Sequence, residues 1–147
     1  MAIRENILSN IVTTLKTISV SGGYHNDVGL VTREPFNWTT LKPKDFPAAL
    51  VQWKLEDKDS TGLEGRHVLA SMTVAIRGVV YAESSLETAI NYFLEDVEKV
   101  MCLDTDRGTY AEYTDPSRIV VYQTEQIKFA IFDFDFIVVY QHLYGSP

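Results

Sequence analysis

The sequence is poor in cysteine, in basic residues and in long apolar runs. Its single cysteine, Cys102, excludes a disulfide within the chain and a cysteine-rich zinc site. Thirteen lysines and arginines face twenty acidic residues, which gives a net charge of −7. Affinity for a nucleic-acid backbone comes from basic side chains that displace counterions, so this charge argues against a protein that grips DNA or RNA.

No stretch is typical of an export signal or a membrane span. The first ten residues mix charged and apolar side chains. The most apolar stretch, Phe129 to Tyr140, is too short to cross a bilayer and contains Asp133 and Asp135. We therefore expect an intracellular protein with no membrane partner.

The composition is that of a globular domain. Apolar residues make up 46% and charged residues 22% of the 147 residues. A chain of this length buries roughly two thirds of its unfolded surface, which is enough for a core without disulfides or metals. We expect a single domain spanning residues 1–147, with no internal repeat or linker.

Two segments have apolar residues at helical spacing. The first runs from Ile3 to Ile18 and should end before Gly22. The second follows Ser84, which forms a predicted capping box with Glu87. Its predicted buried stripe consists of Leu86, Ile90, Phe93, Leu94, Val97, Val100 and Met101. The opposite face of this second helix is predicted to be acidic.

The rest of the chain is predicted to form strands, with a possible bulge at Gly78. The predicted strands are Val28–Arg33, Ala48–Glu56, Arg66–Tyr81, Arg118–Gln126 and Lys128–Gln141. The element order is therefore α-β-β-β-α-β-β. Neighbouring strands that lack a crossover helix should pair antiparallel, so we predict an α+β fold with a mostly antiparallel sheet and two helices.

A search for metal-binding or acid–base groups gives one pair of carboxylates. Asp133 and Asp135 are two apart on a strand and share one face, so they could bind a hard cation, or lie on a solvated face or a subunit contact. The three histidines, His25, His67 and His142, have no metal-binding spacing, and we expect no catalytic role for them.

Other segments that resemble functional motifs lack a residue that the motif requires. Asp104–Gly108 begins like a calcium loop, but its glycine stands where a ligand is needed, so a polar helix exit is the better interpretation. Cys102 has no identifiable basic neighbour and is interpreted as a structural thiol. No nucleophile elbow, phosphate loop or dinucleotide fingerprint occurs. We therefore predict no catalytic, cofactor-binding or metal-binding residues and no enzymatic activity.

Two features predict more sheet surface than the chain can cover by itself. The last strand is apolar on both faces, and the hairpin from Ala48 to Tyr81 is longer than two short helices can cover. One interpretation is a well-packed monomer. The other is that the extra sheet surface is buried against further copies of the chain.

Four segments of the sequence resemble the tail terminator, or tail-completion, proteins of long-tailed bacteriophages. They are Met1–Pro35, Phe46–Gln52, Glu83–Met101 and Phe136–Gly145. The resemblance implies an α+β domain that assembles as a hexameric ring on the finished tail tube, ends tube polymerisation and meets the head–neck connector. It also implies assembly in the host cytoplasm, a place at the tail–neck junction of the virion, and DNA that passes through the lumen without specific binding.

Within such a ring, we expect one surface to dock the tube or a neighbour and another to line the lumen. The docking surface is predicted at the hairpin tip and the end of the last strand, with Asp57, Lys58, Asp59, Leu63, Glu64, Tyr140, His142, Leu143 and Tyr144. The lumen is predicted to carry Glu87, Glu95, Asp96 and Glu98. Six copies carry six times −7, or −42, so an acidic lumen would repel DNA rather than hold it.

Two alternatives stay open. The chain could be another head–tail joining protein, such as a neck or connector adaptor. It could also be a small metal-dependent enzyme that uses Asp133 and Asp135.

Overall fold

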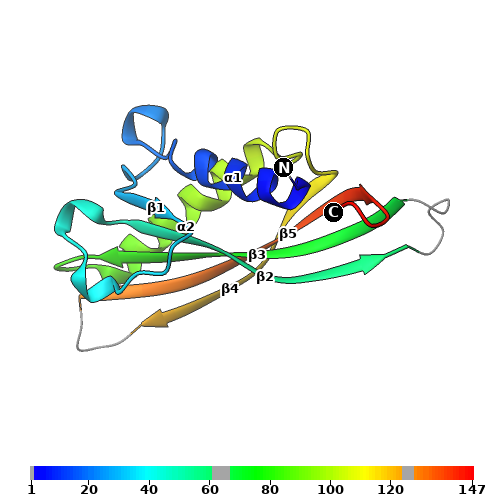
Figure 1. Cartoon of the computed structure of the whole chain (residues 1–147). Coiled ribbons are helices and arrows are strands. Elements are labelled where there is room, and N and C mark those ends of the chain that lie inside the picture. The colour runs from blue at the N-terminus through cyan, green and yellow to red at the C-terminus, as the bar shows by residue number, and fades with distance from the viewer. Residues whose placement is uncertain (1, 61–66, 124–127) are drawn as a thin grey trace.

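The structure is a computed structural model that describes residues 2–60, 67–123 and 128–147. It has one five-stranded sheet with two α-helices on one face, which confirms the predicted α+β fold and element order (Figure 1). The elements are α1 (Ile3–Leu15), β1 (Leu30–Thr32), β2 (Ala48–Asp59), β3 (His67–Tyr81), α2 (Leu86–Leu103), β4 (Tyr113–Gln123) and β5 (Phe129–Leu143). Three short 3-10 turns lie at Val20–Gly22, Trp38–Thr40 and Pro43–Asp45.

The strand order across the sheet is β1-β2-β3-β5-β4. Three of the four pairings are antiparallel, but β1 pairs with β2 in parallel, from Leu30 opposite Ala48 to Thr32 opposite Leu50. The expectation of antiparallel pairing is therefore wrong for β1. The long connection after β1 carries the chain back to the start of the sheet, so that it enters β2 in the same direction.

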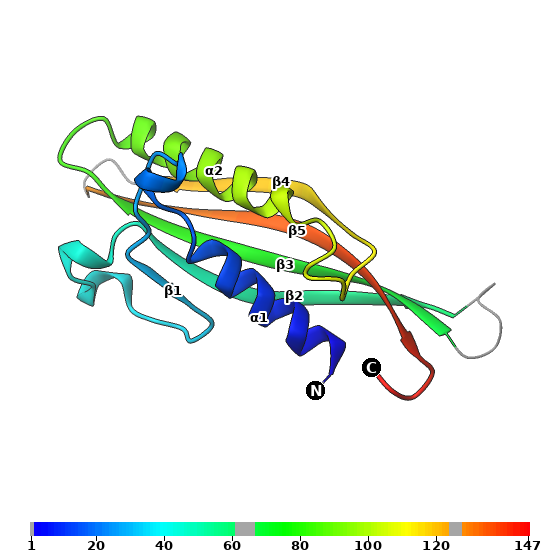
Figure 2. The same ribbon diagram turned by 90° about the horizontal axis from the view of Figure 1, so that it is seen from above.

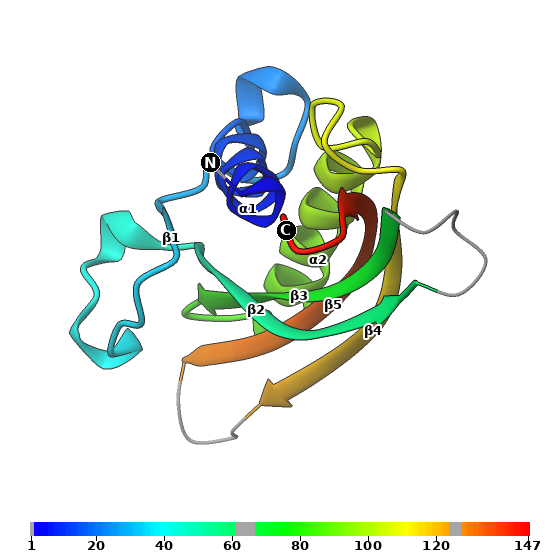
Figure 3. The ribbon, with the colours of Figure 1, turned by 45° about the vertical axis from the view of Figure 1, so that its right-hand side comes forward.

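Both helices lie on the same side of the sheet, as the view from above and the side view show (Figures 2 and 3). The alternation predicted for β3 and β5 is confirmed, because their even-numbered side chains face the helices and are buried. Those of β5 are Ala130, Phe132, Phe134, Phe136, Val138, Tyr140 and His142. We call the other side of the sheet, which carries the odd-numbered residues of β3 and β5, the open face.

Gly78 does not form the predicted bulge. The pairing of β3 with β5 is continuous, with Gly78 directly opposite Phe132. A Cβ atom at position 78 would lie 2.2 Å from Cζ of the Phe132 ring. The glycine therefore makes room for the Phe132 ring, whose outer atoms lie against the strand at this position.

The capping box predicted at the start of α2 is also absent. The residue before the helix is Ser85, whose backbone is left-handed (φ 56°) and whose side chain caps no backbone N–H. The buried stripe predicted for this helix is confirmed at Ile90, Phe93, Val97, Val100 and Met101. In the described part of the chain, neither α-helix is long and apolar enough to cross a membrane.

Candidate assembly surface

The centre of the open face is built from ion pairs between neighbouring strands. Arg77 on β3 is directly opposite Asp133 on β5, and its guanidinium donates two hydrogen bonds to the carboxylate, of 2.7 and 2.9 Å. The hydrogen bonds from Arg77 hold the pKa of the Asp133 carboxyl below its ordinary value, against the opposing effect of burial. This carboxylate is therefore ionised and already paired.

The second carboxylate of the predicted pair, Asp135, also faces a basic side chain. Lys54 Nζ on β2 donates to Asp135 Oδ2 at 3.3 Å. Asp133 and Asp135 thus share one face, as predicted, but each lies beside its own cation, an arrangement typical of cross-strand pairing rather than of a metal site. In the described residues, no group of three or more metal-ligating side chains is found.

A polar network lies on the helix-covered side, where the first turn of α1 meets the halves of β2 and β5 that lie away from β1. We call these halves, residues 53–59 of β2 and 137–143 of β5, the far halves of the two strands. The Arg4 guanidinium donates to both carboxylate oxygens of Glu56, at 3.3 and 2.6 Å, and the Tyr140 hydroxyl donates to Glu56 Oε1 at 2.7 Å. Burial alone would raise the pKa of Glu56, but these hydrogen bonds outweigh it and lower the pKa. Burial and the bond to Glu56 raise the pKa of Tyr140 to about 12.

Two residues predicted for the docking surface belong to this interior network instead. Tyr140 is fully buried, and His142 is 5% exposed. His142 accepts a hydrogen bond from Lys58 Nζ through Nε2 at 3.0 Å, and its Nδ1 lies 2.7 Å from the Leu143 carbonyl oxygen. Both side chains point toward the helices because they occupy even-numbered positions of β5, so their predicted place at the surface is wrong.

Other residues of the predicted docking surface are exposed. Asp57 and Asp59 lie on the far half of β2, and Leu143 and Tyr144 at the end of β5 are 53% and 75% exposed. Lys58 lies between the two aspartates, with its ammonium near Glu56 and His142. Leu63 and Glu64, also predicted there, lie outside the described residues.

The predicted acidic face of α2 is confirmed at three positions, since Glu87, Glu95 and Glu98 are exposed. Asp96 is a correction, because it is 1% exposed. Its carboxylate accepts hydrogen bonds from the backbone N–H groups of His25 and Asn26, at 2.8 and 3.0 Å, and from the Asn26 side chain at 2.9 Å. Asp96 therefore fixes the loop after α1 to α2 instead of facing a lumen.

The turn after α2 is closed by a buried arginine. Arg107 is fully buried and donates to the backbone oxygen of Met101 at 2.6 Å, so it caps the last turn of the helix. Asp104 accepts from the Gly108 N–H at 3.1 Å and from the Asn10 side chain at 3.1 Å. The segment that resembles a calcium loop is thus a helix exit, as predicted.

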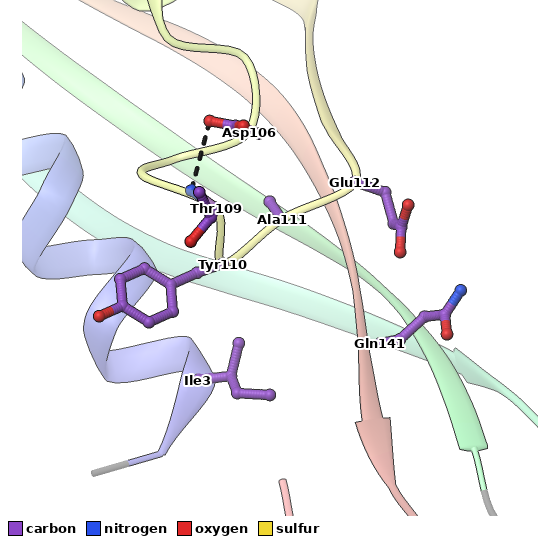
Figure 4. Close-up of a pocket in the computed structure, with 7 residues that line it drawn as sticks. All are labelled: Ile3, Asp106, Thr109, Tyr110, Ala111, Glu112 and Gln141. Carbon is purple, nitrogen blue, oxygen red and sulfur yellow. Dashed lines mark hydrogen bonds between the residues drawn. The ribbon is translucent and has the colours of Figure 1, made fainter.

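A hollow of about 480 Å³ lies beside this turn (Figure 4). Figure 4 shows Tyr110 and Ile3 at one side of it, with Glu112 and Gln141 at the other. Within the turn, the Thr109 N–H donates to Asp106 Oδ1 at 3.3 Å. The hollow is wide and polar, and its carboxylates point in different directions, which gives no converging set of catalytic groups.

The remaining sequence candidates lie apart from one another. Cys102 is exposed on α2 rather than within the buried stripe, and desolvation followed by the charge of Glu98 raises the pKa of its thiol. His25 stacks on Tyr92 at 4.2 Å between ring centroids, whereas His67 is at the exposed start of β3. These residues do not share a site with the buried His142.

Two features of the structure are not foreseen in the sequence. One is the Arg4–Glu56 pair, whose members are 52 positions apart. The other is the set of half-exposed apolar side chains on β4, among them Ile119 and Val121. The only signal for the second feature is the continuous apolar run at residues 119–122, which places apolar side chains on both faces of an edge strand.

Comparison with known proteins does not identify a family for this chain. No protein-family model matches the sequence, and no curated protein matches it either. Among solved structures, the chain is similar to one from a structure described as "Virion of native gene transfer agent (GTA) particle". The identity is 10%, the TM-score is 0.48, and the alignment covers 92% of this chain and 94% of the other. At that score the similarity does not determine the function.

Proposed function

We propose that this chain is a virion structural protein that forms a ring on the end of a bacteriophage tail tube. In this role it ends tube polymerisation and joins the tail to the head–neck connector. The observation that carries the proposal is the one-sided cover of the sheet: both helices pack on one face, and the open face and the far half of the β2–β3 hairpin are left for partners (Figure 1). The four segments that resemble tail terminators support the same function.

The proposed docking surface consists of the exposed members of the predicted set, Asp57, Lys58, Asp59, Leu143 and Tyr144. They come from the far half of β2 and the end of β5, and the two strands reach the same end of the sheet because β3 lies between them. Leu143 and Tyr144 supply apolar area and the hairpin supplies charge. A surface that combines exposed apolar and charged side chains is suited to a protein interface.

The proposed lumen surface is the exposed acidic face of α2, with Glu87, Glu95 and Glu98. Its negative charge is suited to a channel that DNA slides through, because like charges prevent adhesion of the phosphate backbone. Six copies give a total of −42, or six times −7.

The test is to add the purified protein to polymerising tail tube protein and to measure tube lengths by electron microscopy. A terminator stops growth and leaves a ring at one end of each tube. The variant Leu143→Ser/Tyr144→Ser should cap fewer tubes, whereas Leu103→Ser, which removes an exposed apolar side chain of α2, is the matched control. Tubes that grow without limit in the presence of the wild-type protein contradict the proposal, and binding to connector rings alone would indicate a neck adaptor.

A further inference from the structure

Many of the exposed apolar side chains of this chain lie on the two strands at the lateral edges of the sheet. Six of the large apolar residues that are more than two fifths exposed lie on β4 or on the far half of β2. They are Trp53, Leu55, Tyr113, Ile119, Val121 and Tyr122, with exposed fractions of 43% to 55%. Strands at the end of a sheet carry unpaired backbone N–H and C=O groups, and natural proteins usually protect them with charge or cover.

One of these two edges is the strand β4. It is the last strand in the order β1-β2-β3-β5-β4, and it pairs with β5 alone. A bulge between Pro116 and Arg118 interrupts the first half of the strand, but from Arg118 onward its pairing is regular. In this regular half, Ile119 and Val121 point to the helix-covered side, since they pair with Phe134 and Phe132, and Tyr122 points to the open face.

The other edge is the far half of β2. In the described residues, β1 pairs only with Ala48–Leu50, so beyond Leu50 the outer edge of β2 has no strand beside it. Trp53 points to the helix-covered side, where Arg4 lies over its ring at 4.5 Å, and Leu55 points to the open face because it pairs with Thr73. Each of the two edges therefore has exposed apolar side chains both on the helix-covered side and on the open face of the sheet.

We infer that β4 of one copy pairs with the far half of β2 of the next copy, so that the sheet continues from one subunit to its neighbour around the ring. This inference deepens the proposed ring and rests on it. The occupant is a second copy because the two edges lie on opposite sides of one sheet, and only a head-to-tail contact between copies covers both. A foreign strand would cover one edge and leave the other exposed.

The direction of the strands agrees with this pairing. The order β2-β3-β5-β4 alternates in direction, so β2 and β4 run in opposite directions within one subunit. Rotation about a ring axis that is inclined to the strands keeps their alternating sense, so β4 meets the β2 of its neighbour antiparallel, and it staggers the copies along the strands as in a closed barrel. Within one sheet Arg118 is level with Gln52, so this stagger is what brings it opposite the neighbour's Asp57.

Charge favours one register. Arg118 pairs with Asp135 and Asp57 pairs with Ser71, so both side chains point to the open face. If Arg118 lies opposite the neighbour's Asp57, then Val120 lies opposite Leu55 on the open face, with Tyr122 diagonal to Leu55. On the other face Val121 lies opposite Trp53. This register places opposite charges at one end of the contact and apolar side chains along the rest.

The test uses variants blocked at opposite edges. Ile119→Lys/Val121→Lys blocks the β4 edge and Leu55→Lys blocks the β2 edge, while Leu103→Lys, which is on α2, is the control. We expect sedimentation to show oligomers for the wild type and the control. Each edge variant alone should associate at least about a hundredfold more weakly, the effect of withdrawing one or two half-exposed apolar side chains and placing a charge in the contact. An equimolar mixture of the two edge variants should form a dimer and nothing larger, because one intact edge of each kind remains.

A second pair of variants tests the register without touching the apolar contacts. Arg118→Asp should weaken association about tenfold, and Arg118→Asp/Asp57→Arg in the same chain should restore it. Circular dichroism and thermal melting confirm that each variant is folded.

The outcomes separate this inference from the proposed function. A wild-type protein that stays monomeric at high concentration, or edge variants that assemble normally, would overturn the pairing. If such edge variants still cap tail tubes, the proposed function stands without it. Oligomers that depend on both edges but leave tube growth unchanged would support the pairing and contradict the function.

Discussion

Tyr140→Phe tests the polar network that joins α1, β2 and β5. The substitution keeps the buried ring and removes the hydroxyl that donates to Glu56 at 2.7 Å. A hydrogen bond to a charged group contributes about 1.5–3 kcal/mol. Because Glu56 keeps both bonds from Arg4, we expect the free energy of unfolding at pH 7 to fall by about 2 kcal/mol.

The same variant should also change how the free energy of unfolding depends on pH. The pKa of Tyr140 is raised to about 12 in the folded protein, whereas a tyrosine in an unfolded chain has a pKa of about 10. The stability that comes from the neutral phenol is fully present below pH 10 and is lost as the pH rises toward 12. At pH 11 the wild type should have lost about 1.4 kcal/mol of this contribution, which the phenylalanine variant never had.

The assay is urea unfolding of both proteins, followed by circular dichroism at several pH values from 7 to 11. The difference between the two free energies removes the contribution of the other tyrosines and lysines. Tyr144→Phe is the matched control, because Tyr144 is 75% exposed and should give no difference at any pH. A difference between wild type and Tyr140→Phe that stays constant up to pH 11 would refute the reasoning.

Three further substitutions test other parts of the structure by denaturant or thermal unfolding. Asp96→Ala should lower the free energy of unfolding by about 2–3 kcal/mol, because three donors lose their acceptor, and an effect as small as that of an exposed residue would contradict this. Gly78→Ala should cost about 1–3 kcal/mol through overlap with the Phe132 ring, and adding Phe132→Leu should recover part of the loss; purely additive effects would count against the overlap. Arg77→Met should cost about 1 kcal/mol, since the pair is partly exposed. Asp133 has a lowered pKa, so its contribution is present above about pH 4 and is lost on acidification, and the variant should lose less stability than the wild type in melts below that pH.

The elements of this fold could be predicted because each has a clear apolar period. The even-numbered residues of β3 and β5 alternate over the whole strand, and the stripe of α2 returns every three or four positions. The parallel pairing of β1 could not be predicted, since a strand from Leu30 to Thr32 is too short to show which neighbour it joins. Gly78 shows the same limit, because its reason is a ring on another strand.

The site was harder to predict than the fold, because side-chain type does not determine exposure. An aspartate on α2 suggests a solvated face, yet Asp96 is buried by backbone donors from a loop 70 positions away. Tyr140 and His142 lie near the chain end, where exposure is the simplest expectation, but strand parity turns both inward. Such outcomes depend on long-range partners, and a single sequence does not identify them.

The polar network also bears on how an exposed edge can keep its shape. Ala70 of β3 lies between Lys58 of β2 and Tyr140 of β5, and its small side chain leaves room for the phenol to reach across the strand to Glu56. Arg4 completes the contact from the first turn of α1. Hydrogen bonds fix direction as well as distance, so this network holds the far half of β2 in line without an apolar cover over its outer edge. If the edge pairing is correct, Tyr140→Phe should weaken association of the copies as well as stability, although Tyr140 is fully buried and cannot touch a neighbour.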